Sequence, residues 1–280
     1  KSIKYNAPRD YTAQDRAVTA DDYKVLVKSL YANAQSVQVY GGEDAATPDY
    51  GKVYISIKAK SGSNLTEVTK VSLVQSLKSF AVASVTPVII DPETTFIILE
   101  TTFKYDSSLT TKDVSTLETN VINAISSYNT DTLENFTGMF RYSAVGKTID
   151  GADTSILSNI TKVKMYKYIT PTLSSGLKYT LSFNNAFYNP HSGHNSSAGG
   201  IVSSTGFKIN NDSSTNEHFL DDDGAGNIRV YYLSGTTRIY TDSTFGTINY
   251  TTGEIILTSA NITSISNVDG AASTQIRVTT

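Results

Sequence analysis

Apolar residues near the start of the chain recur with the spacing of an amphipathic helix. The set at i, i+3, i+4 and i+7 consists of Tyr23, Leu26, Val27 and Leu30. Thr19 stands directly before this segment, where its side chain can accept a hydrogen bond from the first helical turn. Asp22 places a negative charge beside the positive end of the helix dipole. The pattern predicts a helix that begins after Thr19 and runs to about residue 30.

The pattern then changes to the alternation typical of β-strands. Val37 and Val39 begin one strand, the Gly41-Gly42 pair predicts a turn, and alternating apolar residues over 53–57 predict a second strand. The same element order returns in the residues that follow. A helix-strand-strand unit that occurs twice predicts an α+β fold, in which helices cover one face of a mostly antiparallel sheet.

The second unit has its own helix start, strands and turn. Asn64 and Glu67 resemble a capping pair. The apolar face of this second helix consists of Val68, Val71, Leu73, Val74 and Leu77. We expect strands over 85–90 and 96–105, joined as a hairpin by the tight turn Asp91-Pro92-Glu93-Thr94, because proline presets the backbone for a turn.

A third helix has the clearest apolar face in the chain. That face consists of Val114, Leu117, Val121, Ile125 and Tyr128. Thr110 or Thr111 is expected to cap it, and a short helix is expected over about 132–142.

A strand is predicted over 162–169, and by its period of two one face carries Lys162, Lys164, Tyr166 and Tyr168. Nucleic-acid-binding surfaces use such rows of lysine and tyrosine. The acidic balance of the chain favours a solvated or subunit-facing strand instead.

Helical spacing ends near residue 170, and residues 171–176 (PTLSSG) are the predicted linker. The short strands expected beyond it cover residues 178–183, 206–209, 228–233, 237–240, 246–250, 254–258 and 275–278. They predict a small all-β domain over 177–280, either a sandwich or a partial barrel. The α+β domain then covers 1–170, with residues 1–20 as an extended lead-in.

The composition narrows the classes of partner. The 280 residues include 23 Lys and Arg against 26 Asp and Glu, for a net charge of −3. This balance argues against nucleic acid as a partner, and no polybasic segment suits a membrane surface. Cysteine is absent, which excludes disulfides and thiolate metal sites. No run of about 18 apolar residues predicts a membrane-spanning helix.

Two constellations in the β region are candidate metal sites. The histidines are His191, His194 and His218. With a carboxylate from Asp221, Asp222 or Asp223 they could bind a metal, but the glycine-rich context favours exposed loop histidines. The segment from Asp221 also has part of a calcium-loop spacing, yet Ala225 and Tyr232 stand where charged ligands are needed. A hairpin turn is the prediction there.

No catalytic, cofactor-binding or metal-binding residue is predicted. The motifs of serine hydrolases, phosphate loops, zinc proteases and dinucleotide-binding folds are all absent. An enzyme that uses a pair of carboxylates, as glycosidases do, stays an alternative, but nothing in the sequence singles out a pair.

One segment resembles a known family. Ala7-Pro8, followed by the run from Arg16 to Tyr23 (RAVTADDY), is similar to the start of the baseplate J-like family of contractile-tailed bacteriophages. The family pattern continues with a valine-rich strand and Gly-Gly turn, here residues 37–43, and with a helix and strand, here 73–90. The whole chain is similar to the C-terminal part of baseplate wedge proteins of T-even-type phages. The β region matches them mainly in character, notably in LDDDGAGNIRVYY and GTINYTTGEI.

The resemblance implies a structural, non-enzymatic subunit of the virion tail baseplate, assembled in the host cytoplasm. Such proteins associate with copies of themselves, as a dimer and then a ring, and with other baseplate wedge proteins. The ring holds the baseplate together during sheath contraction. The alternative is an adhesin or carbohydrate-binding module with its site in the C-terminal β domain. The chain does not begin with Met, and we expect it to be part of a longer protein.

Overall fold

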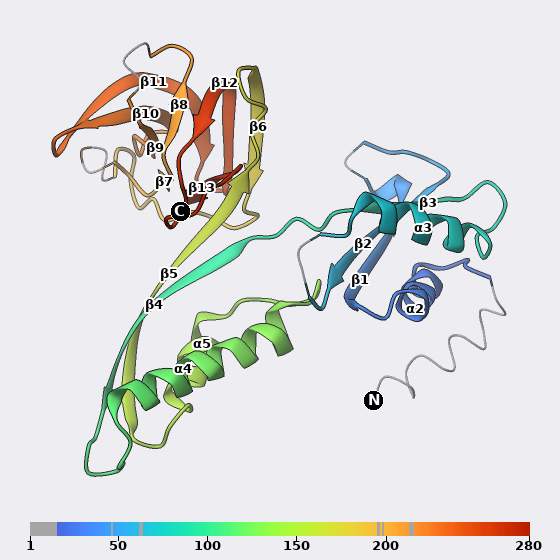
Figure 1. Cartoon of the computed structure of the whole chain (residues 1–280), viewed down its shortest axis with the longest axis horizontal. Helices are drawn as coiled ribbons and strands as arrows, with labels where there is room; N and C mark the ends of the chain where they lie inside the picture. The colour runs from blue at the N-terminus through green and yellow to red at the C-terminus, as the bar shows by residue number, and fades with distance from the viewer. Residues whose placement is uncertain (1–15, 46, 62–63, 195–196, 198, 213–215) are drawn as a thin grey trace. The chain divides into compact units, whose positions relative to one another are not determined.

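The chain passes between two structural units three times. In the computed structural model, the first unit comprises Lys1–Glu93 and Thr102–Ile160, and the second comprises Thr94–Thr101 and Thr161–Thr280. The residues described are 16–45, 47–61, 64–194, 197, 199–212 and 216–280, so most of the predicted lead-in, with Ala7-Pro8, lies outside them. The first unit mixes helices with a sheet and the second is all β, which confirms the α+β class (Figure 1).

Helix α2 (Ala20–Leu30) begins at the residue that the sequence predicts. The Thr19 hydroxyl accepts from the backbone N–H of Asp22, and the Asp22 carboxylate accepts from the backbone N–H of Thr19 at 2.8 Å. This reciprocal capping box satisfies two N–H groups that a helix start otherwise leaves unpaired. Burial raises the pKa of Asp22, but the hydrogen bonds from Thr19 and Val18 outweigh it and leave that pKa below its usual value.

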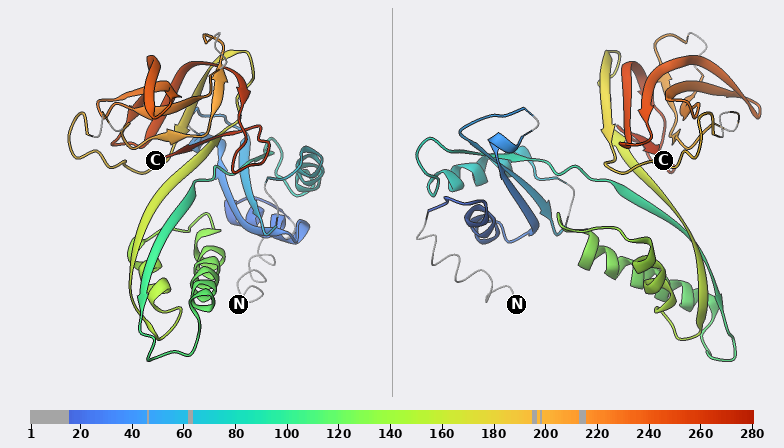
Figure 2. Two further views of the ribbon diagram at one scale, coloured as in Figure 1. Left: turned by 60° about the vertical axis from the view of Figure 1, so that its left-hand side comes forward. Right: turned by 180° about the vertical axis from the view of Figure 1, so that it is seen from behind.

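The first unit contains a three-stranded sheet with two helices on one face. Strand β1 (Ala34–Gly41) runs antiparallel to β2 (Lys52–Ala59), and β2 runs parallel to β3 (Thr86–Ile90). A short 3₁₀ turn, η1 (Gly42–Asp44), follows β1. Helix α3 (Glu67–Lys78) forms the crossover that a parallel pair requires. Helices α2 and α3 contact each other and share one apolar core with the sheet (Figure 2).

The predicted hairpin at 91–94 is wrong. Strand β4 (Phe96–Tyr105) does not pair with β3 but with β5 (Ile156–Ile169), in a different sheet. The apolar run 86–90 reads equally well as a hairpin strand or as a strand buried in a parallel pair, and local turn chemistry cannot decide between them. The sheet is therefore half parallel rather than mostly antiparallel.

The second helix also differs in detail from its prediction. Thr66, not Asn64, caps α3 by accepting from the backbone N–H of Thr69. Leu73 and Leu77 are buried as expected, whereas Val68 and Val71 are exposed. Val68 and Val71 lie five and two positions before Leu73. At that spacing they stand on the opposite side of the helix from the narrow stripe that faces the sheet.

Residues 102–160 form the segment that we call the arm. It contains α4 (Val114–Tyr128), a π-helical turn η2 (Asn129–Leu133) and α5 (Tyr142–Asp150), and α4 packs against α5. Asp113 caps α4, not Thr110 or Thr111. The helix expected over 132–142 is wrong, because the helical turn ends at Leu133 and α5 begins at Tyr142.

Strands of the second unit close into a five-stranded barrel. The strands of this unit beyond β5, of which only some belong to the barrel, are β6 (Gly176–Ser182), β7 (Ser203–Ser204), β8 (Phe207–Ile209), β9 (His218–Asp222), β10 (Asn227–Ser234), β11 (Thr237–Asn249), β12 (Glu254–Ile265) and β13 (Ile276–Thr279). The order β11-β10-β9-β8-β12 closes because β11 also pairs with β12, and β6 adds to the outer edge of β12. Register shifts in β10 and β12 bend these strands, as closure requires.

The second unit begins earlier than the predicted domain. Strand β5 is held by β13, with Ile169 opposite Ile276, and the backbone N–H of Ser174 donates to the carbonyl of Ile262 at 2.7 Å. The predicted linker 171–176 thus lies within the second unit. Two of the predicted strands, 237–240 and 246–250, are one strand, β11, and β9 was not predicted at all.

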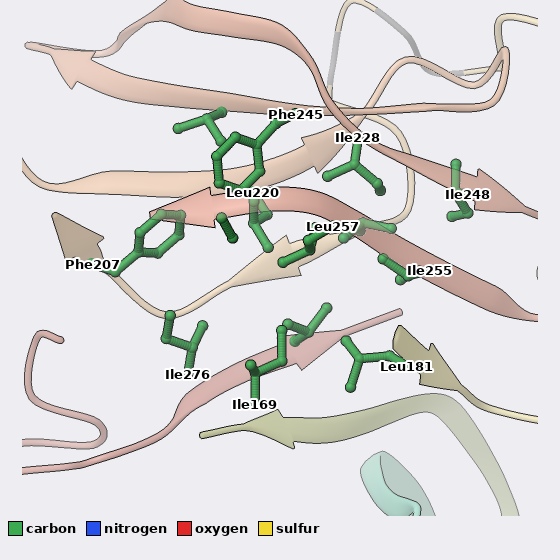
Figure 3. Close-up of a cluster of buried hydrophobic side chains, with 14 of the residues drawn as sticks. Ile169, Leu181, Phe207, Leu220, Ile228, Phe245, Ile248, Ile255, Leu257 and Ile276 are labelled. Atoms are coloured by element: carbon green, nitrogen blue, oxygen red, sulfur yellow. The ribbon is translucent and has the colours of Figure 1, made fainter. Parts of the chain in front are cut away.

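A single apolar cluster of 18 buried residues fills the second unit. Phe207, Leu220, Ile228 and Leu257 point into it from the barrel strands, and Ile276 joins them from β13 (Figure 3). Each of these side chains is no more than 1% exposed. Burying a side chain of this size contributes about 1.5–3 kcal/mol, so this cluster is the main source of stability of the unit.

Candidate interaction surfaces

Asp221 on β9 is a buried carboxylate that the chain itself neutralises. It is 1% exposed and accepts from Arg229 Nε, Arg238 Nη1 and the Tyr240 hydroxyl, each at 2.9 Å. The Arg229 guanidinium lies 4.3 Å from the centre of the Tyr240 ring. A buried charge is tolerated when it is paired and hydrogen-bonded in this way, so Asp221 fixes the outer layer of β9, β10 and β11.

Asp222 holds a loop against the barrel. Its Oδ1 accepts from the backbone N–H groups of Ile201 and Val202, both at 2.7 Å, and Oδ2 accepts from the Tyr250 hydroxyl at 2.6 Å. Burial and this bond raise the pKa of Tyr250. Gly200 has a φ of +63°, and a Cβ on it would lie 2.2 Å from the Asp222 carboxylate. Only glycine therefore suits that position.

Asp223 shapes the turn between β9 and β10. Its Oδ1 accepts from the backbone N–H groups of Ala225 and Asn227 at 2.8 Å and 3.0 Å. Burial raises the pKa of Asp223, but the bonds from Asn227 and Ala225 outweigh burial and hold that pKa below its usual value. The hairpin turn predicted over this segment is confirmed by the antiparallel pairing of β9 with β10.

The histidines do not form one cluster. His194 Nδ1 lies 3.3 Å from His191 Nε2, whereas His218 lies in β9, buried against Asp212, with 3.2 Å between Nε2 and the carboxylate. Burial lowers the pKa of His218, and the charge of Asp212 opposes that shift. Within the part of the chain that is described, no three His, Asp or Glu side chains are arranged to hold a metal ion.

The predicted row of lysine and tyrosine residues does share one face of β5. Lys162 and Lys164 are exposed on it, and Lys164 pairs with Glu100 of β4 at 2.6 Å. Tyr166 stacks on Phe96 of β4 with 4.9 Å between ring centres. The Arg277 guanidinium of β13 approaches the same tyrosine ring at 5.7 Å. The aromatic end of the row is thus packed within the sheet, and its basic end is partly neutralised by β4.

The arm carries its apolar side chains differently from the rest of the chain. Its buried apolar residues are Leu117, Val121, Val145, Ile149 and Ile156. Its exposed large apolar residues are Leu109, Val114, Ile122, Met139, Tyr142, Leu157 and Ile160, and Ile160 is 69% exposed. A contiguous exposed apolar patch marks a contact surface, and the number of exposed apolar side chains in this one segment makes the arm a candidate for such contact. Sequence reasoning missed this surface, although Ile122, beside the buried Val121, falls outside the helical period and could have indicated it.

Comparison with known proteins assigns the family. A family model described as "Baseplate structural protein gp6, C-terminal domain I" matches residues 19–90, which hold α2 to β3. A second, described as "Baseplate structural protein gp6, C-terminal domain III", matches residues 93–168, which hold β4, the arm and most of β5. The two segments together cover more than half of the chain. The chain is a gp6-like baseplate structural protein.

A relative in the curated proteins agrees with this assignment. The chain is 31% identical over 172 residues to the baseplate wedge protein gp6 of Enterobacteria phage T4. The match covers 59% of this chain and only 25% of the T4 protein, so the chain spans about a quarter of that relative. A gp6-like protein belongs to the tail baseplate of the virion. The finer assignment to the J-like family stays a prediction.

Two further predictions concern membranes and carbohydrates. No helix among the described residues is long and apolar enough to cross a membrane. The alternative of a carbohydrate site in the C-terminal β domain stays a prediction, although the Asp221 and Asp222 carboxylates there are fully engaged by their own chain.

Proposed function

We propose that this chain is a structural subunit of a baseplate wedge, which associates with copies of itself and with other wedge proteins. The copies form a dimer and then a ring that links neighbouring wedges and holds the baseplate together during sheath contraction. The proposal extends the gp6-like assignment of residues 19–168 to a specific mechanical role.

The observation that supports the proposal is the number of large apolar side chains that the arm leaves exposed. Ile122 and Leu157 are each 64% exposed, and Ile160 is 69% exposed. Burying such side chains against a partner gains about 25 cal/mol per Å² of apolar area, which is the usual driving force of association. A partner that covers these side chains would therefore be stabilised on the arm by their burial.

A ring subunit also needs contacts that close around an axis, and many modest contacts in a closed ring act together. Such a subunit works by binding rather than by catalysis. The buried carboxylates of the barrel support this, because Asp221 and Asp222 are used to hold strands and loops in place.

The test mixes the full-length protein with the other wedge proteins, and measures mass by sedimentation and shape by negative-stain imaging. We expect wedge-like or ring-like assemblies, and we expect the double variant Ile122→Ser/Leu157→Ser to assemble much less. The matched control is Val68→Ser on α3, which removes a side chain that is 80% exposed but lies outside the arm.

A protein that stays strictly monomeric in the presence of its wedge partners would contradict the proposal. Equal loss of assembly in the Val68 control would contradict the specific role given to the arm.

A further inference from the structure

Strand β4 is an edge strand that neither a proline nor a short length protects. It lies at the end of the sheet order β4-β5-β13-β7, so among the described residues no strand pairs with its outer edge. It is ten residues long and contains no proline. A free edge presents unpaired N–H and C=O groups, and natural proteins usually protect such edges by proline, short strands or clustered lysines.

Strand β5, which pairs with β4, is protected by its lysines. Strand β5 carries three lysines, Lys162, Lys164 and Lys167, and no carboxylate. Two copies of β5 would therefore bring positive charges together without a compensating negative one. The charges of β5 therefore oppose pairing with a second copy of β5, whereas β4 carries charges of both signs.

The charges of β4 are arranged so that the strand complements itself. Its only charged residues are Glu100 and Lys104, both exposed, and four residues apart they lie on the same face. In an antiparallel pair of β4 strands centred on Thr102, Glu100 of each copy stands opposite Lys104 of the other. Opposite charges at directly facing positions stabilise a strand pair, and like charges destabilise it.

The same charges disfavour two other registers of a β4 pair. Centring the pair on Glu100 would place two glutamates face to face, and centring it on Lys104 would do the same for two lysines. Either shift also loses the reciprocal ion pairs. Register in a β-pair is set by such side-chain patterns, so the sequence of β4 favours one arrangement.

We propose that two copies of this chain associate through β4, in an antiparallel ladder centred on Thr102. This inference rests on the self-association proposed above and names its surface. Reciprocal charge pairing at a twofold axis is a property of self-pairing, which is why a second copy is the occupant that fits. The Lys164 side chain, which pairs with Glu100 within one copy, adds a further positive charge beside the same ladder.

The first experiment reverses the charges and follows dimerisation of the full chain by sedimentation. Lys104→Glu and Glu100→Lys should each raise the dimer dissociation constant at least about tenfold, because every facing pair becomes like-charged. The double variant Glu100→Lys/Lys104→Glu should return it to within about threefold of the original. Lys178→Glu, at an exposed lysine of strand β6 and outside β4 and β5, is the matched control and should change it little.

The second experiment uses the absence of cysteine from the chain. Thr102→Cys places a single thiol at the proposed twofold axis, where facing Cα atoms lie about 4.5–5.5 Å apart, within the range of a disulfide. Mild oxidation should give a covalent dimer in high yield. Lys162→Cys, at a position on β5 that is also exposed, should not.

The outcomes separate the two proposals. A chain that sediments as a monomer at every concentration sinks the self-association itself. A chain that dimerises while neither charge reversal weakens it and the Thr102→Cys variant does not crosslink uses another surface, and the β4 inference is then wrong. Weakening by each single reversal, recovery in the double variant and crosslinking at position 102 would together establish the ladder.

Discussion

The barrel and the arm use apolar residues in opposite ways. The unit that contains the barrel encloses 18 buried apolar residues in one cluster. The arm buries Leu117, Val121, Val145, Ile149 and Ile156, and exposes a larger set of seven. The barrel closes on itself, so its strands can turn one face inward together. Helices α4 and α5, with the strands beside them, bury five apolar residues and leave seven large ones exposed. One region encloses its apolar side chains, and the other leaves many of them in contact with solvent.

The largest expected effect comes from damage to the core of the barrel. Phe207→Ala removes a side chain that is 1% exposed, and should lower the free energy of unfolding by about 3–5 kcal/mol. Urea denaturation followed by circular dichroism measures this. Leu220→Met is the volume-conserving control and should cost less than about 1.5 kcal/mol. A loss below about 1 kcal/mol for Phe207→Ala would mean that the barrel core is not closely packed.

The second prediction concerns the polar layer of the barrel. Asp222→Asn keeps the shape of the side chain but replaces one carboxylate oxygen with an NH2 group. One oxygen accepts from the backbone N–H groups of Ile201 and Val202, and the other accepts from the Tyr250 hydroxyl, so either replacement loses hydrogen bonds. Bonds to a charged group are worth about 1.5–3 kcal/mol, so stability should fall by that order. Hydrogen exchange at the Ile201 and Val202 amides should quicken. The exposed Asp44→Asn is the control, and equal losses in both variants would argue against the role of Asp222.

The third prediction tests how the arm is held at its end. Lys112 and then the Ser155 N–H and hydroxyl lower the pKa of Asp153 from 3.8 to about 2. A lowered folded-state pKa contributes stability above the unfolded value, and that contribution is lost as the pH falls through 3.8 toward 2. Lys112→Met should move the pKa of Asp153 up toward 3.8, as measured by carboxyl NMR titration, with Lys162→Met as control. An unchanged pKa would show that the ion pair does not form in solution.

The smallest expected effect is on the folding of the arm itself. Ile122→Ser should change the free energy of unfolding by no more than about 0.5 kcal/mol, since the side chain is 64% exposed. The same variant should weaken association, which sedimentation measures. A large loss of stability in the isolated chain would instead place Ile122 inside a core.

Local chemistry made some elements predictable and left others out of reach. Thr19 and Asp22 fix the start of α2 through bonds between residues three apart, so the sequence alone was sufficient there. Strand β9 was missed because HFLDD has no apolar alternation, and its buried Asp221 and Asp222 are explained only by donors from β10, β11 and distant loops. The structure uses the carboxylates of Asp221 and Asp222 to hold strands and a loop in place, and the expectation that the chain has no metal site stays a prediction.

The α+β class, the capped start of α2, most of the barrel strands and the resemblance to phage baseplate proteins could all be established from the amino-acid sequence. These depend on spacing within a few residues, on turn chemistry and on motifs. The folded chain was needed to show that β3 runs parallel to β2, that β4 leaves for β5, and that the barrel closes between β11 and β12. Strand pairing joins residues far apart in the chain, and several partners suit each strand locally. The packing of the whole core decides which partner each strand takes. It also decides which apolar residues of the arm stay exposed.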